Sequence, residues 1–156
     1  MPPVPVIRPA AAPDVPVLRA MLQALSDQDG GPEVASEAQL LAHGFGPRPL
    51  FRALIAEAAA PVGIIVFFPD FSTHRGEPGL YVQDVYVVPE ARGQGLGRSL
   101  LGAAMRAQDW GARYLTLGVD PGNAGARRFY LREGFRPRGY DFLIVDGAAL
   151  ERLRDA

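Results

Sequence analysis

Short stretches rich in β-branched and aromatic residues recur along the chain, and they predict the strands of a sheet. The predicted strands are residues 4–8, 50–57, 62–68, 81–88, 114–119 and 140–145. We expect residues 50–57 and 62–68 to form a hairpin, and residues 69–79 to form a turn-rich connection. Pro89 ends the fourth strand, because proline cannot donate to the hydrogen-bond ladder.

Apolar residues at helical spacing alternate with these strands and predict helices over residues 14–25, 96–110 and 124–133. A shorter helix begins after Ser36, because Gln39 follows three positions later and completes a capping box. Asn123 and Gly134 are typical residues for the start and the end of the helix over 124–133. The order of elements predicts an α/β (α+β) fold.

The polar, glycine-rich residues 26–34 predict a loop that carries Asp27 and Asp29. One interpretation is a solvated turn. The other is a group of acidic residues at the rim of the substrate site that binds a cationic substrate. On this interpretation Asp27 and Asp29 are candidate substrate-binding residues. Residues 150–154 are too short a segment to assign.

Composition excludes several classes of protein, but it does not indicate which reaction this chain catalyses. A chain of 156 residues suits a single domain over residues 1–156. It has no cysteine, so disulfides, thiolate metal sites and a cysteine nucleophile are excluded, and we expect no metal site. The net charge of −1 and the scattered charges predict no nucleic-acid partner. No apolar run is long enough for a membrane span and no signal-peptide layout is present, so we expect a cytoplasmic location without membrane contact.

The strand over 81–88 leads through a glycine-rich turn into a helix, an arrangement that favours anion binding. The first N–H groups of a helix lack intrahelical partners, and glycine lets a ligand approach the backbone closely. A nucleotide P-loop is excluded because Arg98 follows Gly97, and the dinucleotide fingerprint is excluded because its third glycine falls on Arg98. A plain strand-to-helix turn is the simpler alternative.

The turn has the pattern Arg92-x-x-Gly95-x-Gly97, which resembles the pyrophosphate loop of the GNAT acyl-CoA N-acetyltransferases. A second GNAT-like motif, Asn123-x-x-Ala126-x-x-Phe129-Tyr130-x-x-x-Gly134-Phe135, follows one helix and one strand later. Two motifs in the family order are far more specific than either alone, and the chain is identified as a GNAT member. Residues 6–10, 40–46, 72–97 and 123–130 are also similar to the polyamine and thialysine N-acetyltransferase branch.

The resemblance implies a GNAT fold: a mixed, mostly antiparallel sheet of six to seven strands with helices on both faces. It implies acetyl-CoA as the donor and, with less weight, a homodimer. The pantetheine arm would pair with the backbone of Val85, Tyr86 and Val87. The residues implied in holding the rest of the coenzyme are Arg92, Gly93, Gln94, Gly95, Leu96, Gly97 and Arg98 for the pyrophosphate, and Asn123 and Ala126 beside the acetyl group.

Tyr130 is the family's general acid, and the residue itself is compatible with that role. A phenol with a pKa of about 10 stays protonated at neutral pH and can donate to a departing thiolate. Tyr130 also lies one helical turn after Ala126, on the same face. The alternative is a packed tyrosine whose hydroxyl bonds to backbone.

The acceptor side departs from the branch at Gln83, where the branch has a glutamate that contacts substrate and acts as base. A glutamine accepts hydrogen bonds but takes no proton. Asp84 is titratable, but strand alternation predicts that it points to the opposite face. The base could instead be Asp27, Asp29, Asp120 or His74 through water, or the substrate amine could have a lower pKa.

We therefore expect an enzyme that moves the acetyl group of acetyl-CoA directly to a primary amine of a small molecule, such as a polyamine or thialysine. Alternative acceptors are a protein or peptide amine and an aminoglycoside. The alternative from another class is a non-catalytic acyl-CoA-binding regulatory module, for which Gln83 is the main support.

Overall fold

The computed structural model describes residues 3–156. The chain packs as two compact units, of which the first ends at Asn123 and the second is Ala124–Ala156.

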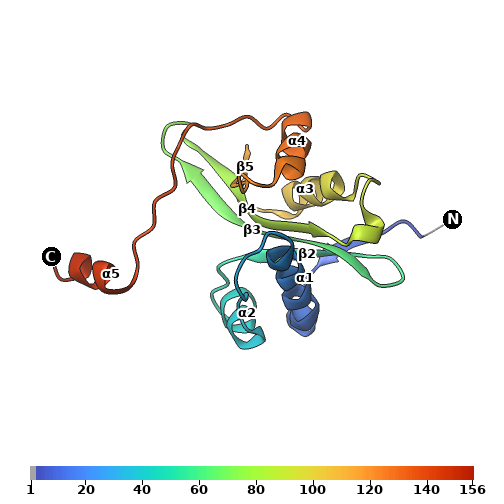
Figure 1. The fold of residues 1–156 in the computed structure, drawn as a ribbon, viewed down its shortest axis with the longest axis horizontal. Coiled ribbons are helices and arrows are strands. Elements are labelled where there is room, and N and C mark those ends of the chain that lie inside the picture. The colour runs from blue at the N-terminus through green and yellow to red at the C-terminus, as the bar shows by residue number, and fades with distance from the viewer. Residues whose placement is uncertain (1–2) are drawn as a thin grey trace. The chain divides into compact units, whose positions relative to one another are not determined.

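The first unit is built on one sheet of five strands in the order β1-β2-β3-β4-β5 (Figure 1). The strands are β1 (Val6–Pro9), β2 (Arg52–Glu57), β3 (Pro61–Ser72), β4 (Glu77–Val87) and β5 (Leu115–Leu117). The first four pair antiparallel, and β4 pairs with β5 in parallel. The mixed, mostly antiparallel sheet is confirmed, but it has five strands rather than six to seven.

The predicted strand over residues 140–145 is wrong for this chain. These residues are neither helix nor strand, and no strand within residues 3–156 pairs with them. Side-chain composition only makes a segment suited to a pleated sheet, whereas the strand itself needs a neighbouring backbone to complete its hydrogen bonds.

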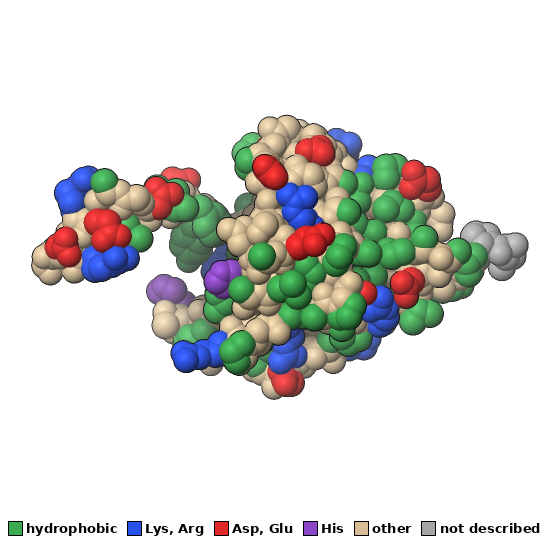
Figure 2. Space-filling model, turned by 90° about the horizontal axis from the view of Figure 1, so that it is seen from below, with side chains coloured by type: hydrophobic (Ala, Val, Ile, Leu, Met, Phe, Trp, Pro, Cys, Tyr) green, Lys and Arg blue, Asp and Glu red, His purple; other side chains and the backbone are tan. Residues whose placement is uncertain are grey.

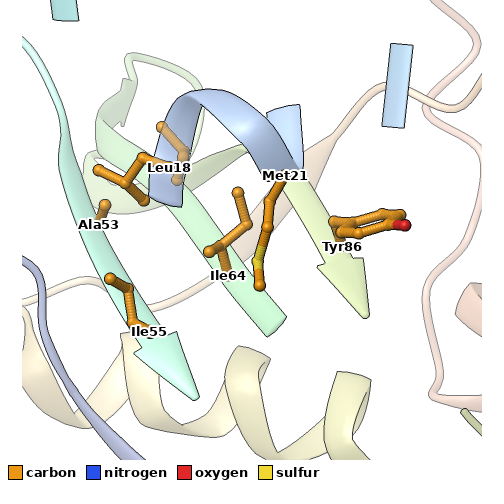
Figure 3. Close-up of a cluster of buried hydrophobic side chains, with 7 residues drawn as sticks. Leu18, Met21, Ala53, Ile55, Ile64 and Tyr86 are labelled. Carbon is orange, nitrogen blue, oxygen red and sulfur yellow. The ribbon is translucent and has the colours of Figure 1, made fainter. Parts of the chain in front are cut away.

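One face of the sheet is covered by α1 (Val15–Gln28), with α2 (Glu37–Gly44) beside it (Figure 1). Leu18 and Met21 of α1 are buried against side chains of three strands, as Figure 3 shows; these are Ala53, Ile55, Ile64, Val66 and Tyr86. The capping box of α2 is confirmed, because the Ser36 hydroxyl accepts from the N–H of Gln39 and the Gln39 side chain accepts from the N–H of Ser36.

The opposite face is covered by α3 (Leu96–Ala107), so helices lie on both faces as expected. A Cβ at Gly63 of β3 would come within 3.3 Å of Leu100 and 3.5 Å of Leu96, which shows how closely helix and sheet approach. The helix ends at Ala107 rather than at position 110. Trp110 lies beyond it and donates its indole N–H to the carbonyl of Gly79 at 2.8 Å, so tertiary packing outweighs its helical spacing.

Three further boundaries differ from the prediction. Helix α1 continues to Gln28, and β3 and β4 continue through most of residues 69–79, leaving the turn at 73–76. Short 3₁₀ segments lie at Ala12–Asp14 and Pro89–Ala91. The second unit holds α4 (Ala124–Arg132) and α5 (Gly147–Arg154), the latter in the segment left unassigned from sequence.

Charges of both signs are interspersed over the face of the molecule shown in Figure 2, where the arginines form no continuous basic area. In the part of the chain that the structure describes, every helix is too short or too polar to span a bilayer. The same residues contain no cluster of three or more metal-ligating side chains.

Candidate functional site: the parted strands and the glycine turn

Strands β4 and β5 separate part-way along their length. Their parallel register runs from Leu80 opposite Leu115 to Val82 opposite Leu117, and it stops there. Within residues 3–156, no strand pairs with residues 83–87 on the side that faces away from β3. Val85, Tyr86 and Val87, predicted to bind pantetheine, lie in this stretch. A single extended ligand with amide groups could pair with the backbone left open there.

A β-bulge interrupts β4 at the start of this stretch. Val82 lies opposite Phe67 and Asp84 opposite Val66, so Gln83 is the extra residue without a counterpart on β3. Asp84 then shares the α1 face with Tyr86, whose partner Ile64 belongs to the same buried cluster as Val66. The strict alternation assumed from the sequence therefore does not hold across Gln83.

The bulge leaves the two polar residues in different surroundings. The Gln83 side chain is exposed, whereas Asp84 is partly buried. Burial raises the pKa of the Asp84 carboxyl from its ordinary value to about 6, because desolvation disfavours the charged form. A carboxyl with this pKa is mostly ionised at pH 7 and still basic enough to accept a proton.

The glycine turn follows β4 and opens α3. Gly93 and Gly95 have φ angles of 76° and 78°, the left-handed region that glycine adopts without strain. A Cβ at either position would meet no atom within 4 Å, so the space beside both glycines is open. Gly95 is the N-cap of α3 and supplies no capping side chain, which leaves the first helical N–H groups available to a ligand. The turn thus has the features needed to bind a diphosphate.

Arg92 was predicted to contribute to the pyrophosphate site, and its side chain joins three parts of the first unit. Its Nε donates to the carbonyl oxygen of Val87 at 2.8 Å, and its Nη2 donates to Gln28 Oε1 at 2.7 Å. The guanidinium lies 5.6 Å from the centre of the Tyr86 ring. Arg92 therefore connects the end of β4 to the last residue of α1. Sequence reasoning missed Gln28, since nothing in the sequence signals a contact between residues so far apart.

A cavity of about 270 Å³ lies beside this connection and is lined by Gln28, Asp29, Asp120, Gly122 and Asn123. It contains Asp29, one of the two acidic residues predicted to bind substrate. The Asp120 carboxylate accepts from the N–H of Gly122 at 2.7 Å, which fixes the turn after β5. With two carboxylates in its lining, the cavity suits a cationic molecule.

Other candidates for a proton acceptor lie elsewhere. Asp27 is exposed, is not part of the cavity lining, and accepts a hydrogen bond from Gln23 Nε2 at 2.9 Å. His74 is exposed in the turn between β3 and β4. It is at least seven strand residues from the bulge, or roughly 20 Å at the usual rise per residue. Burial raises the pKa of the Asp84 carboxyl toward neutrality, which makes Asp84 the candidate with the best physical support.

The second unit carries Ala126 and Tyr130, which lie on α4 one turn apart. The Tyr130 ring contacts those of Phe129 and Phe135, with ring centres 5.1 Å and 5.3 Å away. Gly134 ends the helix with a φ of 96°, as its predicted C′ position requires. The N–H of Phe135 donates to the Tyr130 carbonyl oxygen at 3.0 Å and closes this end.

Comparison with known proteins agrees with the fold and the turn. A family model described as "Acetyltransferase (GNAT) family" matches residues 18–135, well over half of the chain. The chain belongs to the GNAT acetyltransferase family. It is an acetyl-CoA-dependent N-acetyltransferase, and the open glycine turn and parted strands fit that donor.

Relatives of this GNAT protein include proteins named as amine N-acetyltransferases. The thialysine N-epsilon-acetyltransferase of Bos taurus is 33% identical over 132 residues, covering 76% of this chain and 77% of that protein. The aminoalkylphosphonate N-acetyltransferase of Salmonella typhimurium is 34% identical over 82 residues, which are 52% of this chain and 53% of that one.

Solved structures support the fold alone, since their sequence identity is low. An integron cassette protein of V. cholerae has a TM-score of 0.78 at 21% identity, covering 98% of this chain and 99% of that one. An aminoglycoside N-acetyltransferase in complex with CoA has a TM-score of 0.75 at 18% identity, covering 94% and 97%.

Proposed function

We propose that this acetyltransferase acetylates the primary amine of a small cationic molecule. The observation that supports it is the cavity with Asp29 and Asp120 in its lining, coupled through Gln28 to Arg92 of the diphosphate turn. Two carboxylates favour a positively charged acceptor, and a volume of about 270 Å³ suits a small amine rather than a large one.

The glycine turn and the parted strands of the first unit would bind most of the donor. The diphosphate binds the N–H groups of residues 93–98, with Arg92 and Arg98 beside it, and the pantetheine pairs with Val85, Tyr86 and Val87. Asn123 and Ala126 border the acetyl group. The positive φ of Gly93 and Gly95 and the open space beside both glycines support this assignment.

In the proposed reaction the neutral amine attacks the thioester carbonyl carbon. The C–N bond forms, the C–S bond breaks, and a backbone N–H of β4 stabilises the developing oxyanion. A proton leaves the amine nitrogen, and a proton from the Tyr130 hydroxyl goes to the thiolate of CoA. Tyr130 is thus the proposed catalytic acid.

Asp84 is the proposed base, in place of a carboxylate at position 83. A primary amine with a pKa of about 10.4 is neutral in only roughly one molecule in a few thousand at pH 7, so a proton acceptor is needed. Asp84 has no hydrogen-bond partner or ion pair assigned within residues 3–156, and burial raises its pKa to about 6. Its place beside the parted strands supports its action on the amine, directly or through one water.

The proposed acceptor-binding residues are Gln83, Asp29 and Asp27. Of the two aspartates, only Asp29 belongs to the cavity lining. Gln83 is exposed at the bulge and can accept or donate a hydrogen bond without removing a proton. The names of the thialysine and aminoalkylphosphonate relatives favour an acceptor that carries an amine on a short chain. Acceptors such as peptides or aminoglycosides are the second candidate.

The experiment that tests this function follows release of the CoA thiol with a panel of amines. Diamines, thialysine, aminoalkylphosphonates, an aminoglycoside and a lysine peptide are compared at equal concentration. Turnover with small cationic amines supports the proposal, and turnover only with the peptide or the aminoglycoside contradicts it. Calorimetric binding of acetyl-CoA without any turnover would favour the regulatory module instead.

The homodimer and the cytoplasmic location stay predictions.

A further inference from the structure

The side chain of Gln28 belongs to both halves of the candidate site. It lines the cavity together with Asp29 and Asp120. Its Oε1 atom also accepts a hydrogen bond from Arg92 Nη2 at 2.7 Å. Gln28 therefore contacts both the space proposed for the amine and the arginine proposed to lie beside the diphosphate.

The guanidinium of Arg92 is held along one edge and is open at the opposite corner. Nε donates to the carbonyl oxygen of Val87 at 2.8 Å and Nη2 donates to Gln28, and these two nitrogens share one edge of the planar group. The Tyr86 ring lies 5.6 Å from the guanidinium. Among residues 3–156, Nη1 has no hydrogen-bond partner. Its two N–H groups are available to a phosphate oxygen, and the protein contacts fix their orientation.

One buried cluster supports both ends of this connection. Met21 of α1 and Tyr86 of β4 belong to the cluster that Figure 3 shows, and Leu25 packs against it. Gln28 follows Leu25 by three residues and is the last residue of α1. The negative end of the helix dipole also favours a guanidinium at this point. The packing thus keeps the end of α1 and the end of β4 at a distance that the Gln28–Arg92 bond can span.

The strength of the bond depends on what fills the cavity. Gln28, Asp29 and Arg92 are all exposed, so water competes for the bond while the cavity is open. An amine in the cavity would exclude part of that water and lower the local dielectric, which strengthens a charge-assisted hydrogen bond. A diphosphate on Arg92 would in turn fix the guanidinium and, through it, the amide of Gln28.

We propose that Gln28 is a positioning residue that couples the two substrates. Binding of a small cationic amine in the cavity strengthens the hold of Arg92 on the diphosphate of CoA, and CoA strengthens amine binding by the same factor. Coupling through a single exposed hydrogen bond should lie at the lower end of the usual range, at about fivefold in affinity. The inference rests on the proposed function, because it takes the cavity as the acceptor site.

The test measures the affinity of CoA by calorimetry, with and without saturating 1,4-diaminobutane. CoA carries no acetyl group, so a ternary complex forms without reaction. The variants are Gln28→Met, Arg92→Met and the double variant, because methionine keeps much of the side-chain length and removes the hydrogen bond. The matched control is Arg19→Met on the same helix, which loses a 3.1 Å hydrogen bond to Glu33 outside the cavity and the turn.

We expect 1,4-diaminobutane to tighten CoA binding about fivefold in the wild type and in Arg19→Met, and to leave it unchanged in Gln28→Met. The double variant should bind CoA as Arg92→Met does, because Gln28 acts through Arg92. Gln28→Glu retains an acceptor oxygen for Arg92 and should keep the coupling. In steady-state kinetics, Gln28→Met should raise the KM for acetyl-CoA while kcat at saturation of both substrates changes little.

Two results would overturn the inference. One is full coupling in Gln28→Met, or none in the wild type. The other is a loss of amine affinity in Gln28→Met that is equally large in the Arg92→Met background, which would show a direct contact with the amine only. Thiol release from small amines without coupling contradicts this inference alone. Coupling by the diamine with thiol release only from a peptide or an aminoglycoside contradicts the proposed function alone.

Discussion

Replacing Asp84 with asparagine should remove activity and raise stability at the same time. The substitution keeps the shape of the side chain in the bulge of β4 but removes the group that we propose takes the proton from the amine. Loss of a general base typically lowers the rate by about 10²- to 10⁴-fold. We expect kcat/KM to fall within that range, with acetyl-CoA affinity unchanged because Asp84 lies outside the diphosphate turn.

The gain in stability follows from the cost of burying the charge. Burial raises the pKa of Asp84 from 3.8 to about 6, and at ~1.4 kcal/mol per pKa unit the charged carboxylate lowers stability at pH 7 by up to about 3 kcal/mol. Because the folded-state pKa is the higher one, the folded protein binds more protons between pH 4 and pH 6, and the wild type regains this stability as the pH falls. The asparagine variant should therefore be about 1–3 kcal/mol more stable at pH 7, and the difference should fall below about 1 kcal/mol at pH 4 and vanish at lower pH.

The assay combines urea unfolding at pH 4 and pH 7 with the pH dependence of kcat/KM. The wild type should show an acid limb with an apparent pKa of about 6, and the variant should lack it. Gln83→Glu in the Asp84→Asn background restores a carboxylate to the bulge and should recover part of the activity. If the variant is less stable at pH 7 with its acid limb intact, Asp84 has a structural role and the reasoning is refuted.

Three further predictions concern the donor site, the acid and the fold. Tyr130→Phe should lower turnover by ~10²-fold or more with acetyl-CoA affinity little changed, measured by thiol release and calorimetry; unchanged turnover removes Tyr130 from the mechanism. Gly95→Ala, at a φ of 78°, should cost about 1–2 kcal/mol and weaken CoA binding, whereas Gly102→Ala inside α3 should leave calorimetric CoA affinity unaltered. The paired hydrogen bonds from Arg8 lower the pKa of Asp14 to about 2, so Asp14→Asn should cost about 1 kcal/mol or less at pH 7 after solvent screening. Because that pKa is lowered, the loss should disappear as the pH falls from about 4 to about 2, and a loss that persists at pH 2 would contradict the ion pair.

Local signals in the sequence predicted the parts of the fold that depend on neighbours in the chain. The capping box at Ser36 and the glycine at 134 act over a few residues, so the boundaries they mark are nearly correct. The glycine turn is likewise specified by its own residues, since Gly93 and Gly95 adopt a positive φ that glycine tolerates without strain.

The parts that depend on distant partners were not predictable. Nothing in residues 81–88 signals that Gln83 has no counterpart on β3, because a bulge is a property of two strands. The contact of Arg92 with Gln28 joins the turn after β4 to α1 and has no pattern in the sequence. Residues 140–145 have strand composition, but they pair with no strand among residues 3–156.

The central claim is that the turn at the start of α3 binds the diphosphate of CoA, and backbone amide NMR tests it most directly. CoA and pantetheine, which lacks the diphosphate, are titrated separately into the ¹⁵N-labelled protein. The account predicts that CoA shifts the amide signals of residues 93–98 and that pantetheine leaves them nearly unchanged while shifting those of residues 83–87. Binding of CoA that leaves residues 93–98 unshifted would contradict it.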